Sequence, residues 1–246
     1  MASLGPTVTV SVPEAGHGGG STPPHYGGDG GGPGDGYPDY GRRLRRARLG
    51  LAVALAPILM FFVSLVSAAI VRRGLPTFDG TTNTYMHDWI PVDLPFALLL
   101  FNTGLLAASS LSAEFARRQI TRQAALAPVR SIPGVSLGRE TGVPWLYLTV
   151  LLGAGFLAGQ WRAWQELAAR GFYLATNASS SFVYLLTAAH AVHLAGGAVV
   201  LLYAAVVSLF HKPIEARRIV VDVTAWYWHF IFLLWVAILA LLWLLR

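Results

Sequence analysis

Three histidines lie inside long apolar stretches of the sequence, where an ionisable side chain is costly and commonly serves a function. His190 and His193 are three residues apart and share one face of a helix, whereas His229 lies in the next apolar stretch. Imidazoles can ligate a metal ion, and histidines on separate helices of a bundle can hold a haem. A four-coordinate metal needs further ligands, however, and a bis-histidine haem needs facing histidines at matched depths. The residues alone therefore favour hydrogen-bonded structural histidines, and we assign the chain no catalytic, metal-binding or cofactor-binding residue.

Several other kinds of chemistry are excluded by missing residue types. The chain has no cysteine, which excludes disulfides, thiolate zinc sites, iron–sulfur clusters and cysteine nucleophiles. No Asp, Glu, Lys or Arg lies in the middle of an apolar stretch, which argues against a carboxylate proton relay, a charged transporter site and a voltage sensor. We therefore expect the chemistry to come from partner proteins. A membrane transporter that works alone is the alternative from another class.

The elements that carry these residues are predicted to be membrane-spanning helices. Hydrophobic residues make up 54% of the chain and charged residues only 12%, far from the composition of a soluble domain. The apolar stretches are continuous rather than alternating, which favours helices over the strands of a barrel. We predict an all-α, polytopic membrane protein with a bundle of five transmembrane helices. The spans are expected at about 49–71, 92–113, 142–162, 181–210 and 223–245.

The N-terminal segment has a different composition. Residues 1–41 contain 13 of the 26 glycines and 6 of the 14 prolines and show no hydrophobic period. This composition is typical of a disordered tail. We therefore divide the chain into a disordered cytoplasmic tail, 1–41, and a five-helix transmembrane domain, 42–246.

The basic residues predict the orientation of the helices. Lys and Arg near the ends of spans are retained on the cytoplasmic side. Thirteen of the 18 lie before the first span, between the second and third, and between the fourth and fifth. We expect a cytoplasmic N-terminus, a C-terminus on the opposite side and no nucleic-acid partner. Five basic residues near span ends are candidates for binding lipid head groups: Lys212, Arg217, Arg218, Arg72 and Arg73.

Small residues interrupt the third and fourth spans. Gly153, Gly155 and Gly159 fall in the third, and Gly196 and Gly197 in the fourth. Such patches let helices approach closely. They serve either packing within the chain or docking on a partner subunit, and the sequence leaves both open.

Four segments, in order, resemble subunit III of the haem-copper oxidases. Residues 94–118 contain a Pro, Asn-Thr and Ser-Ser arrangement, and residues 155–167 a Gly-Gln and Trp pattern. Residues 180–197 contain Phe-Val-Tyr, Thr, His-x-x-His and Gly-Gly, and residues 225–244 contain Trp-His-Phe followed by Trp. The resemblance extends over about 50–246, all but the tail.

The resemblance implies the compact five-helix bacterial form of cytochrome c oxidase subunit III, in the bacterial inner membrane with the C-terminus on the periplasmic or external side. Such a subunit carries no haem or copper, which belong to partner subunits I and II. It packs against catalytic subunit I, supports proton uptake and binds phospholipid. Cytochrome c donates electrons to the complex, which can join a larger respiratory supercomplex. Five residues on motif positions are then structural: Asn102, His190, His193, Trp228 and His229.

The chain departs from the family pattern at one position. Many members carry a membrane-embedded Glu shortly before a Phe-Phe pair, whereas here the residues before Phe61 and Phe62 are Ala-Pro-Ile-Leu-Met. Any role of that carboxylate in proton uptake is therefore not carried over. Subunit III of a quinol oxidase and the accessory protein of a nitric oxide reductase remain alternatives.

Overall fold

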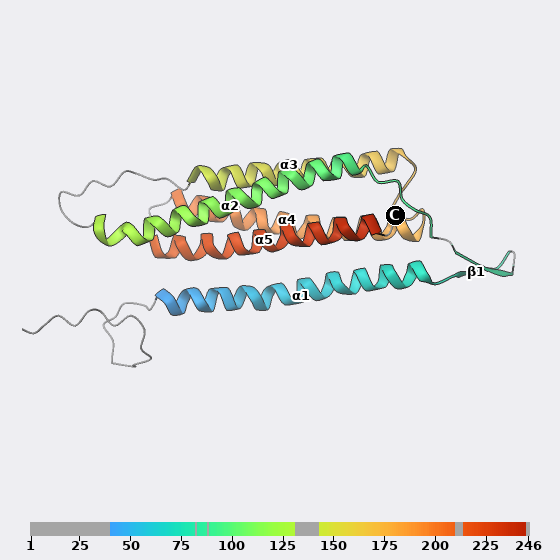
Figure 1. Ribbon diagram of the computed structural model, residues 1–246, viewed down its shortest axis with the longest axis horizontal. Helices are drawn as coiled ribbons and strands as arrows, with labels where there is room; N and C mark the ends of the chain where they lie inside the picture. Colours follow the sequence, from blue (N-terminus) through green and yellow to red (C-terminus); the bar gives the residue numbers. More distant parts are fainter. Residues whose placement is uncertain (1–39, 82, 88, 131–142, 210–213, 245–246) are drawn as a thin grey trace, which may run out of the picture. The chain divides into compact units, whose positions relative to one another are not determined.

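The computed structural model describes residues 40–81, 83–87, 89–130, 143–209 and 214–244 (Figure 1). The described residues form five helices and one two-stranded antiparallel sheet. The predicted five-helix fold is confirmed. In chain order the elements are α1 (Tyr40–Gly74), β1 (Thr77–Asp79), β2 (Thr84–Met86), α2 (Phe96–Arg130), α3 (Val143–Ala169), α4 (Ala178–Leu209) and α5 (Ile214–Leu244).

The lengths and compositions of the helices are those of membrane spans. Helices α1, α2, α4 and α5 are each long and apolar enough to cross a bilayer. Helix α3 is less apolar because it includes Trp, Tyr, Thr and Gln, but its 27 residues extend about 40 Å at about 1.5 Å per residue. A helix pairs its own backbone N–H and C=O groups, whereas lipid offers these groups no hydrogen-bond partner. The chain is therefore a multi-pass membrane protein.

Four of the helices form the core of the bundle. Helix α2 packs against α3 and α5, and α4 packs against the same two helices. The side chains of Trp228, Trp235, Phe156 and Leu106 are among the largest that are fully buried between them. Helix α1 contacts only α4 and α5 among the described elements. Within its apolar segment only 6% of the residues are buried, against 33–39% in α2, α4 and α5, so α1 is peripheral.

The helices extend beyond the charge-free stretches that defined the expected spans. Helix α1 starts at Tyr40 and includes the arginines that precede the first stretch, while α2 continues to Arg130 rather than ending near residue 113. Charged residues end a membrane span without ending a helix. In α2 they support it, because Glu114 pairs with Arg117 and Arg118 at helical spacing.

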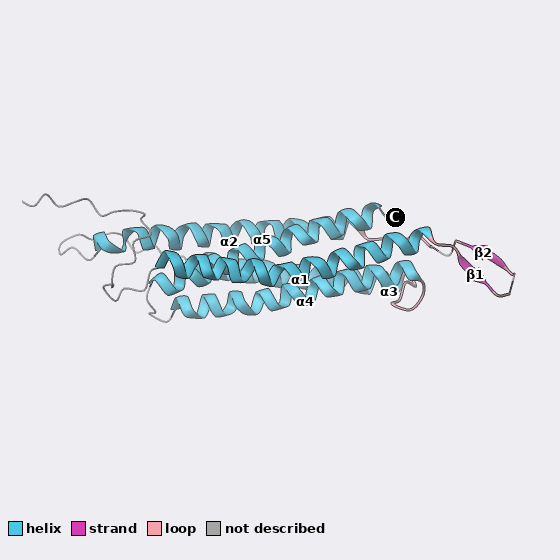
Figure 2. Cartoon of the chain, turned by 90° about the horizontal axis from the view of Figure 1, so that it is seen from below, coloured by secondary structure: helices cyan, strands magenta, loops and turns pink. Residues whose placement is uncertain are grey.

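A short hairpin joins α1 to α2, and Figure 2 shows it beyond the ends of the helices. Phe78 pairs with Tyr85 across the two strands, and their rings lie 5.3 Å apart. Asn83, in the turn, has a positive φ of 52°, which Asn tolerates better than most residues. The sequence did not predict this hairpin because three-residue strands are too short to show a period of two.

Candidate functional site

Trp228 is the side chain around which the four core helices meet. It is fully buried, and its indole nitrogen donates a 3.0 Å hydrogen bond to Ser109 Oγ on α2. A Cβ atom on Gly153 of α3 would lie 2.8 Å from Trp228 Cζ2. A Cβ on Gly197 of α4 would lie 3.2 Å from Trp228 Cζ3 and 2.6 Å from Tyr227 Cε1. These two glycines therefore serve packing within the chain, because each leaves space for an aromatic ring of α5.

Hydroxyl groups join α2 to α3 beside this ring. Ser109 Oγ donates to the carbonyl oxygen of Thr149 at 2.9 Å, and Thr149 Oγ1 donates to Ser112 Oγ at 3.0 Å. Ser112 Oγ in turn donates to the carbonyl oxygen of Trp145 at 2.8 Å. Each of these hydroxyl groups therefore has a hydrogen-bond partner within the protein, which a hydroxyl facing lipid would lack.

Asn102 and Gly159 form a second close contact between α2 and α3. Asn102 is fully buried, and neither polar atom of its amide has a hydrogen-bond partner among the described residues. A Cβ on Gly159 would lie 2.6 Å from Asn102 Cγ and 2.7 Å from its Nδ2, so only glycine fits without movement. The motif residue Asn102 therefore lies flat against the backbone of α3.

The three histidines have different surroundings. His229 Nδ1 lies 2.5 Å from Ser110 Oγ on α2, so this imidazole joins two helices. His193 Nδ1 lies 2.7 Å from the carbonyl oxygen of Ala189, within its own helix. His190 is fully buried, and neither ring nitrogen has a hydrogen-bond partner among the described residues. The expectation of a hydrogen bond is thus wrong for His190 in this structure.

Aromatic packing replaces hydrogen bonding around His190. Its ring centroid lies 5.1 Å from that of Trp235 on α5 and 5.9 Å from that of Phe156 on α3. Trp235 itself donates from its indole nitrogen to Thr103 Oγ1 on α2 at 2.9 Å. The His190 imidazole therefore lies in an aromatic layer that reaches α3 and α5.

A cluster of charged residues joins α1, α2 and α5 near one end of the bundle. The Asp222 carboxylate, on α5, accepts from Arg48 Nε at 2.8 Å and from Arg48 Nη2 at 2.9 Å. It also accepts from Arg117 Nη1 on α2 at 3.4 Å. Glu114 accepts from Arg117 Nε at 2.7 Å, and its Oε2 lies 3.5 Å from His229 Nε2. The cluster therefore links the peripheral helix α1 to the core.

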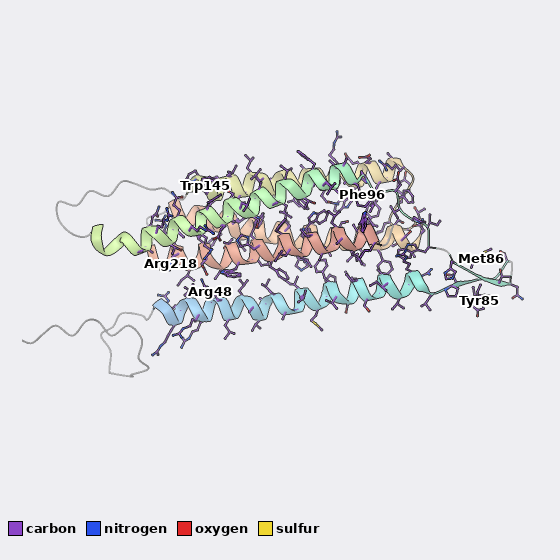
Figure 3. All side chains as sticks on the ribbon, in the orientation of Figure 1. Arg48, Tyr85, Met86, Phe96, Trp145 and Arg218 are labelled. Carbon is purple, nitrogen blue, oxygen red and sulfur yellow. The ribbon has the colours of Figure 1, made fainter. Side chains whose placement is uncertain are left out.

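The candidate lipid-binding residues do not come together at one place. Arg73 Nη1 donates to the carbonyl oxygen of Leu244 at 2.8 Å, and Arg72 Nη1 lies 3.4 Å from that of Leu75. Arg217 and Arg218 are half-buried near the start of α5, and Lys212 lies outside the described residues. Figure 3 shows Arg218 at the same end of the bundle as Arg48, far from the hairpin residue Tyr85.

Among the described residues, no three side chains of the His, Cys, Asp and Glu types gather where they could hold a metal ion. The polar groups instead connect helices. Sequence reasoning missed the pairing of Arg48 with Asp222, which are 174 positions apart, whereas the helical spacing of Glu114, Arg117 and Arg118 was available to it.

Comparison with known proteins identifies relatives over most of the chain. No family model matches it. A protein of Nocardia farcinica named "Probable cytochrome c oxidase subunit 3" is 24% identical over 205 residues, 83% of this chain and 90% of the relative. "Cytochrome c oxidase subunit 3" of Corynebacterium diphtheriae is 26% identical over 197 residues, 80% and 86% of the two chains. "Cytochrome c oxidase subunit 3" of the vertebrate Petromyzon marinus is 28% identical over 151 residues, 60% and 51%. The resemblance suggested by the helix motifs is confirmed: the chain is similar over about four fifths of its length to proteins named cytochrome c oxidase subunit 3.

Proposed function

We propose that this chain is the non-catalytic subunit III of a proton-pumping cytochrome c oxidase in aerobic respiration. The observation that carries the proposal is similarity to proteins of that name over about four fifths of the chain. In this proposal haem and copper are held by partner subunits I and II, cytochrome c donates electrons to the complex, and oxygen is reduced to water. The chain contributes to the enzyme as a subunit and carries no catalytic centre of its own.

The proposed role is to stabilise the catalytic subunit and to support proton uptake through packing and bound phospholipid. Broad apolar surfaces support this role: Phe101 on α2, Leu151 on α3 and Val192 on α4 are 65%, 69% and 70% exposed. Such side chains require lipid or partner helices around them. Helix α1 contains no Asp or Glu, so proton uptake is not supported by a carboxylate of this helix.

The proposed location is the inner membrane of a bacterium, with a cytoplasmic N-terminus and a periplasmic or external C-terminus. The charged cluster of Arg48, Arg117 and Arg118 lies near the starts of α1 and α5, the end expected in the cytoplasm. The hairpin would then lie outside the cell membrane. Assembly of the oxidase into a larger respiratory supercomplex is compatible with this orientation.

The proposal is tested by measuring which electron donor drives oxygen consumption by the purified complex. A tagged chain is extracted from its native membrane in mild detergent, and oxygen consumption is measured with reduced cytochrome c and with a quinol. We expect cytochrome c to drive oxygen consumption that co-purifies with the tag. Activity with quinol alone, or nitric oxide reduction without oxygen consumption, would instead assign the chain to a quinol oxidase or a nitric oxide reductase.

A further inference from the structure

The hairpin between α1 and α2 exposes a pair of aromatic rings. Phe78 of β1 and Tyr85 of β2 lie directly opposite each other, so their side chains share one face of the two-stranded sheet. The ring centroids are 5.3 Å apart, and the ring planes meet at 62°. Phe78 is 52% exposed and Tyr85 is 72% exposed. The pair therefore presents an apolar face that is already formed in the free chain.

This aromatic face lies beyond the lipid rather than within it. The apolar part of α1 ends at Arg72 and Arg73, and Figure 2 shows the hairpin continuing past the ends of the helices. From Arg73 to Phe78 an extended chain covers up to about 16 Å, at about 3.3 Å per residue. The head-group layer on one side of a bilayer is only about 5–8 Å thick. A belt of aromatic residues at the lipid interface therefore does not account for Phe78 and Tyr85.

Aromatic rings that are exposed to water at this position favour a protein partner. Contiguous apolar surface outside the membrane commonly marks a site of interaction. Tyr and Phe are enriched at the centres of protein–protein interfaces. The two strands hold both side chains in place before binding, so little conformational entropy is lost when a partner covers them. The hairpin thus has the features of a docking element for another protein.

The charge of the hairpin segment indicates which kind of protein fits. Residues 74–93 contain Asp79, Asp88 and Asp93 and no lysine or arginine. Asp93 pairs with Arg170, after α3, at 2.7 Å, so the other two aspartates give the hairpin its negative net charge. An anionic membrane surface or a second copy of the same hairpin would repel this charge. A basic protein surface would attract it and would fix the orientation of docking.

We infer that the hairpin formed by β1 and β2 docks a basic, water-soluble protein surface outside the membrane, with the rings of Phe78 and Tyr85 covered by an apolar part of that surface. The surface belongs to a soluble protein or to the extramembrane domain of a larger one. The inference goes beyond the proposed function, because it concerns a contact outside the membrane and applies to any complex that contains this chain.

A photo-crosslinking derivative of phenylalanine in place of Tyr85 identifies what covers the hairpin. The matched control is the same replacement at Tyr203, which is 55% exposed on the membrane-spanning helix α4. Both variants are irradiated in native membranes, and the crosslinked peptides are identified by mass spectrometry. We expect position 85 to crosslink to a protein segment that lies outside the membrane and has a positive net charge. We expect position 203 to crosslink to lipid or to apolar helices.

Several results of this experiment would overturn the inference. They are crosslinks from position 85 to lipid alone, to a transmembrane segment, to a second copy of this chain, or to a neutral or acidic segment. The absence of any crosslink from position 85 would overturn it as well. None of these results bears on the proposed function, which is tested by the electron donor.

Charge variants test the electrostatic part of the contact. Asp79→Lys reverses one charge of the hairpin, and Asp79→Glu retains the charge as the matched control. We expect Asp79→Lys to lower the crosslink yield from position 85 at least about fivefold, and Asp79→Glu to leave it within about twofold. High salt should also lower the yield, because salt screens exposed charges. An unchanged yield in Asp79→Lys or at high salt overturns the inference, with thermal unfolding of each variant as the check that the bundle is intact.

Discussion

Replacing Gly159 with alanine introduces one methyl group at the closest contact between α2 and α3. The new Cβ would lie 2.6 Å from Cγ and 2.7 Å from Nδ2 of Asn102, well inside van der Waals contact. Overpacking of this kind costs about 1–3 kcal/mol. Alanine returns up to about 1 kcal/mol through its higher helix propensity. With the full return of about 1 kcal/mol, we therefore expect a net loss of up to about 2 kcal/mol, which lowers Tm by up to about 8 °C for a chain of this size.

The assay is thermal unfolding in a fixed detergent, with Gly155→Ala as the control. A Cβ on Gly155, one turn away on the same helix, has its nearest neighbour at 3.7 Å, so Gly155→Ala should leave Tm unchanged or raise it slightly. Asn102→Ala removes the amide, so adding Gly159→Ala to that background should cost little, with a coupling free energy of about 1–3 kcal/mol. Equal Tm values for Gly159→Ala and Gly155→Ala, or strictly additive effects with Asn102→Ala, would refute the proposed close contact.

Three further predictions concern charged residues and a histidine. Asp222→Asn should lower Tm by about 2–4 °C, because it weakens charge-assisted hydrogen bonds worth about 1 kcal/mol when one partner, Arg48, is half exposed; an unchanged Tm in the same detergent would show that the cluster does not hold α1 to the core. His229→Gln should leave the haem content of the purified complex unchanged and at most weaken retention of the chain, since Gln can still bond to Ser110; loss of a haem absorption band would contradict a structural role. Neutralising Lys212, Arg217 and Arg218 together should lower the phospholipid that co-purifies, measured by phosphate content per chain, and unchanged phospholipid would exclude these residues as its binding site.

The helices could be predicted from the sequence because lipid imposes a simple requirement. A segment of about 20 uncharged residues must be helical to satisfy its backbone. The ends of the helices could not be predicted by the same rule. Helix α2 continues to Arg130, and Glu114 pairs with Arg117 and Arg118 in the first turn beyond the apolar stretch.

The contacts between helices could not be predicted from the sequence alone. Gly153 and Gly159 belong to one G-rich pattern, yet one accommodates Trp228 and the other Asn102, and nothing in their spacing assigns these partners. For the histidines, the helical period predicted that His190 and His193 lie on one helix. It did not predict which groups each imidazole contacts. His190 lies among aromatic rings, and His193 bonds to its own backbone.

The resemblance to a known family indicated a function, which the spacing of individual residues did not. A single His-x-x-His is compatible with a metal site, and the residues alone made such a site improbable without excluding it. Four motifs in order over about 50–246 resemble subunit III of the haem-copper oxidases, and relatives named cytochrome c oxidase subunit 3 match about four fifths of the chain. The proposed function therefore rests on the order of the motifs rather than on any one side chain.

The central claim is that this chain belongs to an oxidase whose haem is held elsewhere. The most direct test is a reduced-minus-oxidised spectrum of the purified complex, repeated after the tagged chain has been dissociated from it in harsher detergent. We predict haem a bands in the complex and in the remaining subunits, and none in the separated chain. Haem that follows the separated chain, or a wild-type preparation without any haem, would contradict the account.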